Sequence, residues 1–160
     1  MEFIISVFSQ CKLIRRNQPS PIVGENFEKL VTDKKIDMKF PFTFYGTAVS
    51  AFSVGVDGKI EIEVQGAYAL INNYIFGDLQ CETEISDKKE YFAVRRSCPT
   101  NIDNKIDTIK VMHLIHSNGK ISFYYENIPR GLKKGDVESG IGYDIRCGEG
   151  NNCYLHSNLH

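Results

Sequence analysis

Cysteine, histidine and carboxylate side chains are the groups in this chain whose spacing could support chemistry. Near the C-terminus, Cys153, His156 and His160 have the C-x2-H-x3-H spacing of zinc ligands. A fourth ligand is missing, and chain ends are where order is commonly lost. We therefore expect a frayed tail over these residues and no zinc site.

Asparagine and aspartate residues within 101–107 have the composition of a calcium-binding loop. The candidate ligands are Asn101, Asp103, Asn104 and Asp107. Lys105 lies among them, and the glycine and the terminal glutamate of an EF-hand are both missing. The pattern therefore favours a solvated loop.

Two histidines, His113 and His116, lie three residues apart on a segment that we predict to be a strand. Their side chains should point to opposite faces, so they cannot share a metal. We expect one on the surface and one at the edge of the core. The sequence also has no G-x-S-x-G, H-E-x-x-H, P-loop or G-x-G-x-x-G motif. We predict that the protein is not an enzyme and has no cofactor and no metal.

The elements that position these groups are predicted to be strands. Phe52 and Val54, and then Ile60 and Ile62, alternate with small or charged residues, as in half-buried antiparallel strands. A three-residue loop between them pairs Val54 with Ile60 and Phe52 with Ile62, and it places Gly58 in the left-handed conformation. A two-residue loop would instead put glutamates opposite the apolar face.

A second hairpin is predicted around the Asn118-Gly119 pair. Here a two-residue loop puts Leu114 opposite Phe123, and Met112 opposite Tyr125. We expect that face to belong to the core.

Further strands are expected near 67–76, 89–96 and 137–146, and a short helix is expected over 26–33. The sequence thus predicts an all-β protein, an antiparallel β-sandwich with a poorly ordered or partly helical N-terminal segment. The expected parts are an N-terminal segment or linker (1–35), the sandwich (36–147) and a C-terminal tail (148–160). The predicted core includes Phe42, Phe52, Val54, Ile60, Ile62, Leu114, Phe123 and Tyr125.

Length and charge restrict the class of protein. The 160 residues suit one domain, and 42% hydrophobic content excludes a disordered polymer. A net charge of −1 gives no electrostatic reason to expect nucleic acid or an acidic membrane surface. The apolar run Phe3–Phe8 is too short for a signal peptide, and no stretch approaches the roughly 18 apolar residues of a membrane span. We expect a fragment that is truncated at both ends.

The stretch Met38–Gly46 contains an FPF-x-FYG pattern, and its Pro41 predicts an edge strand because proline donates no backbone hydrogen bond. This pattern, the later hairpin Gly119–Pro129 and the glycine-containing segment Val137–Ile145 occur in an order that resembles the plexin domain-containing proteins, the tumour endothelial marker family. The likeness covers Val31–Ile145. The inserted Thr43 and the stretch between Cys81 and Cys98 depart from the family pattern.

The resemblance implies a non-enzymatic extracellular module of a cell-surface or secreted receptor or adhesion protein, anchored by a single membrane span in its full-length form. Its partner would be an extracellular protein ligand or a matrix component, and not nucleic acid. We expect the partner to contact the loops and edge strand at Pro41–Gly46, with Phe44 and Tyr45 as the candidate binding residues.

Two other functions stay open. One is a calcium-dependent carbohydrate-binding or hydrolytic β-sandwich, which would need an acidic pair or calcium cluster in one pocket. The other is a truncated gene product without independent function.

Five cysteines bear on the compartment. No CxxC pair is present, and a strand-rich, adhesive-looking domain favours disulfides in an oxidising setting. Cys147 and Cys153 flank a run that can turn back on itself, which favours a bridge between them. Cys81 and Cys98 would then form a second bridge and leave Cys11 free. The alternative is a cytoplasmic protein with five reduced thiols.

Overall fold

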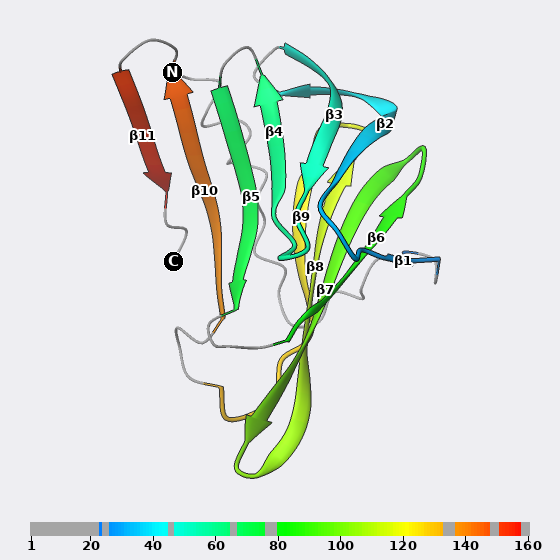
Figure 1. Cartoon of the computed structure of the whole chain (residues 1–160), viewed down its shortest axis with the longest axis vertical. Helices are drawn as coiled ribbons and strands as arrows, with labels where there is room; N and C mark the ends of the chain where they lie inside the picture. The colour runs from blue at the N-terminus through cyan, green and yellow to red at the C-terminus, as the bar shows by residue number, and fades with distance from the viewer. Residues whose placement is uncertain are drawn as a thin grey trace.

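Two β-sheets make up the described part of the chain (Figure 1). The computed structural model describes residues 23, 26–44, 47–64, 67–75, 80–132, 137–147 and 151–157. One sheet has the order β1 (Glu28–Lys29), β6 (Glu82–Asp87), β7 (Tyr91–Ile102), β8 (Lys105–His116), β9 (Ile121–Asn127). The other has the order β11 (Asn151–Ser157), β10 (Val137–Cys147), β5 (Ala67–Ile75), β4 (Ile60–Val64), β3 (Thr47–Val54), β2 (Lys34–Phe44).

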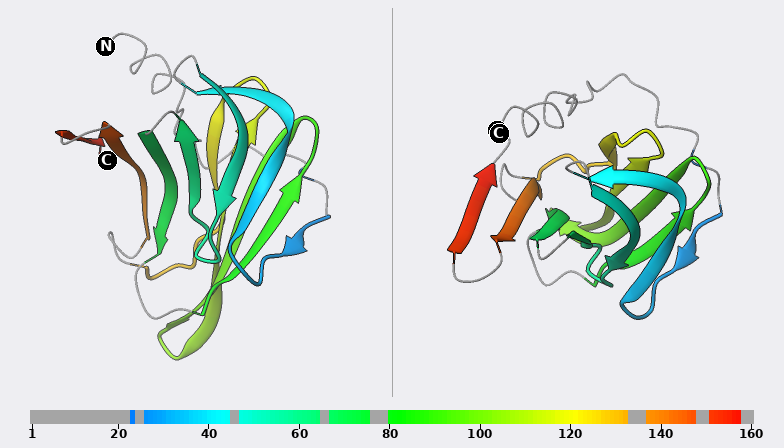
Figure 2. Two further views of the ribbon diagram at one scale, coloured as in Figure 1. Left: turned by 45° about the horizontal axis from the view of Figure 1, so that its top comes forward. Right: turned by 90° about the horizontal axis from the view of Figure 1, so that it is seen from above.

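All neighbouring strands in both sheets are antiparallel. The sheets pack against each other, as the two views of Figure 2 show. The predicted antiparallel β-sandwich is therefore confirmed. The strands expected near 67–76, 89–96 and 137–146 are present as β5, β7 and β10.

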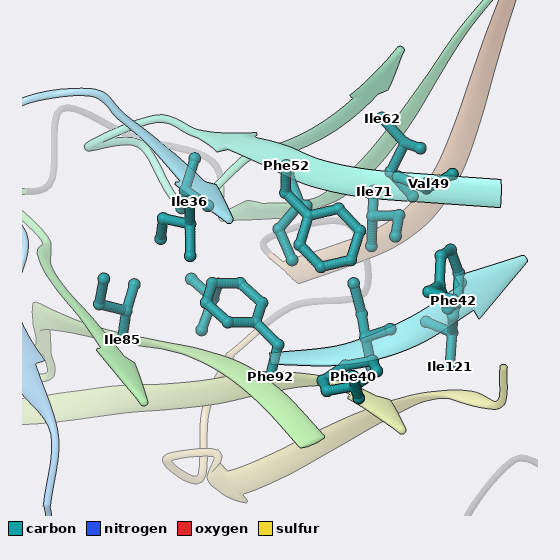
Figure 3. Close-up of a cluster of buried hydrophobic side chains, with 14 of the residues drawn as sticks. Ile36, Phe40, Phe42, Val49, Phe52, Ile62, Ile71, Ile85, Phe92 and Ile121 are labelled. Carbon is teal, nitrogen blue, oxygen red and sulfur yellow. The ribbon is translucent and has the colours of Figure 1, made fainter. Parts of the chain in front are cut away.

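The core between the sheets is built around Phe52. The Phe52 ring lies 5.7 Å from the ring of Phe42 and 5.5 Å from that of Phe92, centroid to centroid. Phe42 and Phe52 belong to the six-stranded sheet and Phe92 to the five-stranded sheet, so these contacts join the two layers (Figure 3). The buried members of this cluster are Leu30, Ile36, Phe40, Phe42, Val49, Phe52, Val54, Ile60, Ile62, Ile71, Ile85, Phe92, Val94, Ile115 and Ile121.

Two segments differ from the sequence-based expectation. The helix predicted over 26–33 is wrong: Glu28–Lys29 form β1 against β6, and the Leu30 N–H donates to the Thr83 carbonyl at 2.8 Å. Burial of Leu30 in the core favours this pairing over a weak local helix signal. The expected tail, 148–160, contains β11, which pairs with β10. The sheets thus extend beyond the expected limits of 36 and 147.

Strand β8 is buried on both of its faces. Ile115 lies in the core between the sheets, whereas Met112 and Leu114 lie on the outer face beside Ala93. Four partly buried side chains pack against this outer cluster, namely Val23, Phe27, Tyr91 and Tyr124. Around Met112 and Leu114, the outer face of the five-stranded sheet is therefore buried as well as the inner one.

The β3–β4 hairpin has the predicted turn. Val54 pairs with Ile60 across a three-residue loop, and Gly58 has a φ of 79°. The Asp57 carboxylate accepts a hydrogen bond from the Lys59 N–H at 3.1 Å, which fixes the loop. The β3–β4 register that the apolar pattern predicts is therefore confirmed.

The β8–β9 hairpin has the same turn, which contradicts the predicted two-residue loop. The His116 N–H donates to the Lys120 carbonyl at 2.8 Å, so three residues form the loop, and Gly119 has a φ of 83°. The Asn118 side-chain oxygen accepts from the Lys120 N–H at 3.1 Å, as Asp57 does in the first turn.

The register of β8 and β9 is consequently shifted by one residue from the prediction. Leu114 pairs with Ser122, and Phe123 pairs with His113. Leu114 is buried on the outer face, Phe123 is partly buried on the inner face, and Tyr125 is 43% exposed. The other predicted core residues are buried, namely Phe42, Phe52, Val54, Ile60 and Ile62.

The two matched turns generate a prediction about Gly58. Alanine at Gly58 or at Gly119 adds a side chain to left-handed backbone, which costs about 1–2 kcal/mol. A Cβ at 58 would also lie 2.2 Å from Arg96 Cδ, whereas no atom of the described residues lies within 4 Å of a Cβ at 119. We expect Gly58→Ala to lower the free energy of unfolding by about 1–3 kcal/mol more than Gly119→Ala does. Urea unfolding of both variants measures the difference, and equal losses would show that Arg96 yields without cost.

Candidate functional site

Phe40–Phe44 of the FPF-x-FYG motif lie on β2, which is the last strand of the six-stranded sheet. The edge position predicted from Pro41 is thus confirmed. Phe40 and Phe42 are buried in the core, while Pro41 and Thr43 are exposed. The Phe44 side chain and Tyr45 lie outside the described part, so their binding role stays a prediction.

Strand β2 has features that oppose pairing with another strand. Its ladder with β3 is interrupted between Asp37 and Phe42, and it carries the exposed residues Lys35 and Lys39. The Lys39 ammonium lies 3.1 Å from an Asp87 carboxylate oxygen and donates to the Asp87 carbonyl at 3.0 Å. Charges, proline and an irregular ladder protect edge strands from association. The β2 edge is therefore linked to the five-stranded sheet through Lys39 and Asp87, and it is poorly suited to pairing with a strand of another molecule.

A two-stranded arm extends from the five-stranded sheet. β6 pairs with β7 no further than Ser97, and β9 pairs with β8 no further than Lys110. β7 and β8 stay paired beyond those points, up to Ile102 and Lys105. Residues 99–108, called the arm below, therefore reach past both neighbouring strands, at the bottom of Figure 1.

The arm ends in a tight turn and exposes one large apolar side chain. Asp103 and Asn104 both have positive φ, 52° and 61°, as the central residues of a two-residue hairpin turn require. Ile106 follows and is 86% exposed. Sequence reasoning missed it because the polar residues around it suggested a loop.

A disulfide anchors the base of the arm. Cys81 and Cys98 are bonded, with their Cα atoms 4.1 Å apart, as predicted. Cys98 is buried with Ile109 and Val111, and Leu132 packs against the same cluster. The arm therefore starts from a covalently fixed, well-packed base.

The candidate calcium ligands do not converge on one site. Asp103 and Asn104 form the exposed turn, and the Asp107 carboxylate accepts hydrogen bonds from the Thr108 N–H at 2.7 Å and from Asn127 Nδ2 at 3.3 Å. Within the described ranges, no three His, Cys, Asp or Glu side chains gather in a way that could hold a metal ion.

A polar cluster lies between the sheets beneath the β3–β4 turn. The Thr83 hydroxyl donates to the Val56 carbonyl at 2.6 Å, which fixes this turn to the opposite sheet. Burial lowers the pKa of Arg96, and the charge of Asp57 partly offsets that effect. Burial alone would raise the pKa of Asp57, but hydrogen bonds and charge from Lys59, with the charge of Arg96, lower it overall. These groups hold the turn and the sheet beneath it together.

His113 is fully buried beside this cluster, deeper than predicted. Its ring packs edge-on against Phe123 at 5.1 Å between centroids, and neither ring nitrogen has a hydrogen-bond partner among the described groups. Burial and, second, the charge of Arg96 lower the pKa of His113 to about 3. His113 is therefore neutral near pH 7.

His116 points to the other face of the strand, as expected. Its Nε2 lies 3.2 Å from Ser122 Oγ. Partial burial, followed by the charge of Lys120, lowers the pKa of His116. The two histidines do not form a common site.

The remaining candidate residues lie at the C-terminal end. In the β10–β11 ladder, Cys147 is opposite Asn151 and Cys153 is opposite Ile145. The side chains of Cys147, Cys153 and His156 lie outside the description, as do His160 and Cys11 altogether. The Cys147–Cys153 bridge therefore stays a prediction.

Comparisons with family models, curated proteins and solved structures give no significant match. The resemblance to the plexin domain-containing proteins is accordingly untested. Within the described ranges, no helix combines the length and apolar character needed to cross a membrane.

The buried histidine gives a pH-dependent prediction. The unfolded chain takes up a proton at this histidine below pH 6.5, whereas folded His113 does so only near pH 3. Above pH 6.5, His113 therefore has no effect on the free energy of unfolding. As the pH drops from 6.5 toward 3, His113 lowers that free energy. The loss should reach about 2 kcal/mol at pH 5.

The variant His113→Leu should remove most of this loss, and His116→Gln should keep most of it. Urea unfolding at pH 7 and pH 5 tests both. The range down to pH 5 is informative because carboxyl groups with a lowered pKa, such as Asp57, change the pH dependence of stability only at more acidic pH. An unchanged slope in His113→Leu would assign the pH dependence to other groups.

Proposed function

We propose that this chain is a non-enzymatic extracellular protein-binding module and that its arm contacts the partner. The observation that carries the proposal is Ile106, 86% exposed on a hairpin that extends past its neighbouring strands. A lone exposed isoleucine is ordinary on a protein surface. An isoleucine presented on a projecting hairpin with a fixed base offers apolar contact area at low entropic cost.

The disulfide at the base of the arm supports an oxidising compartment. Structural disulfides such as Cys81–Cys98 persist in secreted and cell-surface proteins and are rare in the cytosol. Together with the resemblance to the plexin domain-containing ectodomains, this favours an extracellular protein or a matrix component as the partner.

The arm is a better contact surface than the expected one at Pro41–Gly46. Phe40 and Phe42 of that motif fill the core, so they are not accessible to a partner. Lysines and a broken ladder protect the same edge. We therefore place the partner contact at residues 99–108.

A solid-phase binding assay tests this proposal with immobilised laminin and collagen IV as probes. We expect the whole chain to bind at least one of them and Ile106→Ser to weaken that binding about tenfold, a change of about 1.4 kcal/mol. The matched control is Val31→Ser, a 75% exposed position two residues after β1, which should bind like the wild type. Strand β1 lies well away from the arm (Figure 1).

Both substitutions should leave thermal unfolding unchanged, because both side chains are mostly exposed. Equal binding by wild type and Ile106→Ser would move the contact away from the arm. Absence of binding to both probes would argue against a matrix partner.

A further inference from the structure

We propose that Asn118 in the β8–β9 turn is a site of spontaneous deamidation, and that this turn accepts the aspartate product but not the isoaspartate product. The inference is independent of the function proposed for the arm. Asn118 is followed by Gly119, and no other asparagine of the chain precedes a glycine. Asn118 is also exposed at the tip of its hairpin, so water reaches its side chain.

The reaction needs only the Asn-Gly pair and water. The backbone nitrogen of Gly119 attacks Cγ of Asn118 and closes a cyclic imide, and the side-chain amide nitrogen leaves as ammonia with the proton that Gly119 loses. One water molecule then opens the imide. Cleavage of the bond at Cγ gives aspartate in an ordinary main chain. Cleavage at the main-chain carbonyl gives isoaspartate, in which the chain runs through the former side chain.

The attacking nitrogen of Gly119 is accessible. Glycine has no Cβ that could shield it. Apart from the adjacent residues, no atom of the described part of the chain lies within 4 Å of the place where a Cβ would stand. At the equivalent Gly58, Arg96 Cδ lies 2.2 Å from that place. The space beside Gly119 is therefore open to the base that must remove its proton.

Two hydrogen bonds of the closed turn oppose the attack. The Gly119 N–H donates to the His116 carbonyl at 2.9 Å, and the Asn118 side-chain oxygen accepts from the Lys120 N–H at 3.1 Å. Both bonds have to break before the Gly119 nitrogen can face Cγ of Asn118. Deamidation therefore proceeds from an opened turn, and its rate in the folded chain depends on how often the turn opens.

The β3–β4 turn shows that aspartate fits at this position. Asp57 stands where Asn118 stands in the β8–β9 turn, and each side chain accepts a hydrogen bond at 3.1 Å from the N–H two residues later. Glycine and lysine follow in both turns. The Asp57 carboxylate also lies 2.6 Å from the Lys59 ammonium. Aspartate at 118 would therefore keep the turn and gain Lys120 as a counter-ion.

Isoaspartate does not fit the same turn. Its main chain has one more carbon atom between Cα of residue 118 and the nitrogen of Gly119. The side-chain oxygen that accepted from Lys120 becomes part of the main chain, so this hydrogen bond is lost. The longer turn no longer matches the three-residue spacing that sets the β8–β9 register. We expect this product to weaken the hairpin.

Peptide mapping of the whole folded chain, after incubation at pH 7 and at pH 9, tests the site. Trypsin releases Val111–Lys120, in which Asn118 is the only asparagine, and Ile121–Arg130, in which the exposed Asn127 precedes an isoleucine. The first peptide should gain acidic forms, faster at pH 9 because base removes the attacking proton. The second peptide should stay unchanged, because the isoleucine side chain shields the nitrogen beside Asn127.

The same incubation in guanidinium chloride tests the role of the turn. The first peptide should convert roughly tenfold faster in the unfolded chain, because the two hydrogen bonds of the turn no longer oppose the attack. Conversion of that peptide only in the unfolded chain would overturn the proposal, because the folded turn would then prevent the reaction. Equal conversion of both peptides in the folded chain would overturn it as well.

Urea unfolding tests the fate of the two products. Asn118→Asp should have an unfolding midpoint at or above that of the wild type. The isoaspartate form, separated from the incubated wild type by ion exchange and identified by electron-transfer fragmentation, should have a lower midpoint. Asn118→Gln is the control and should give no acidic form, because its longer side chain closes a ring far less readily. An Asn118→Asp midpoint as low as that of the isoaspartate form would overturn the claim that the turn accepts aspartate.

Discussion

Burial of apolar side chains between two sheets is the constraint on which the rest of this structure depends. Phe52 stands at the centre, between Phe42 of its own sheet and Phe92 of the other. Neither sheet could bury these rings alone, because each presents only one side of the cluster. Two polar contacts at the edges of the sandwich join the sheets, Lys39 with Asp87 and Thr83 with Val56. Their partners come within reach only when the two sheets pack together.

The inner face of the β7–β8 ladder changes in character along its length. The pair Phe92–Ile115 lies in the core, and Val94 pairs next with the buried, neutral His113. Arg96 follows opposite Val111, beneath the turn of the other sheet. Cys98 comes last, opposite Ile109, where it is buried and bonded to Cys81. The disulfide adds a covalent restraint to this packed end of the ladder.

Sequence patterns predicted those elements whose two faces differ. The β3–β4 register followed from alternation because glutamates occupy its solvent face. The β8–β9 register did not, because both faces of β8 are buried and an apolar residue is acceptable on either. The β8–β9 register is set by the turn, through the hydrogen bond of the Asn118 side chain and the left-handed conformation of Gly119. Asp57 and Gly58 play the same two parts in the β3–β4 turn.

Other differences arise from contacts between distant segments. Strand β6 has glutamates at alternate positions and gave no strong strand signal, yet it pairs with both β1 and β7. Pro41 of the FPF-x-FYG motif predicted an edge strand correctly, but two of the motif's aromatic rings, Phe40 and Phe42, are buried in the core. The arm had no sequence signal because its length depends on where β6 and β9 stop pairing.

Native-state hydrogen exchange is the most direct test of the shared core. If the Phe52 cluster joins the layers, the most protected amides of β4 and of β8 should exchange with the same free energy, equal to that of global unfolding. Phe52→Ala should then lower both values together by about 3–5 kcal/mol. If β8 kept its protection while β4 lost its own, the two sheets would be independent units and this account of the fold would be wrong.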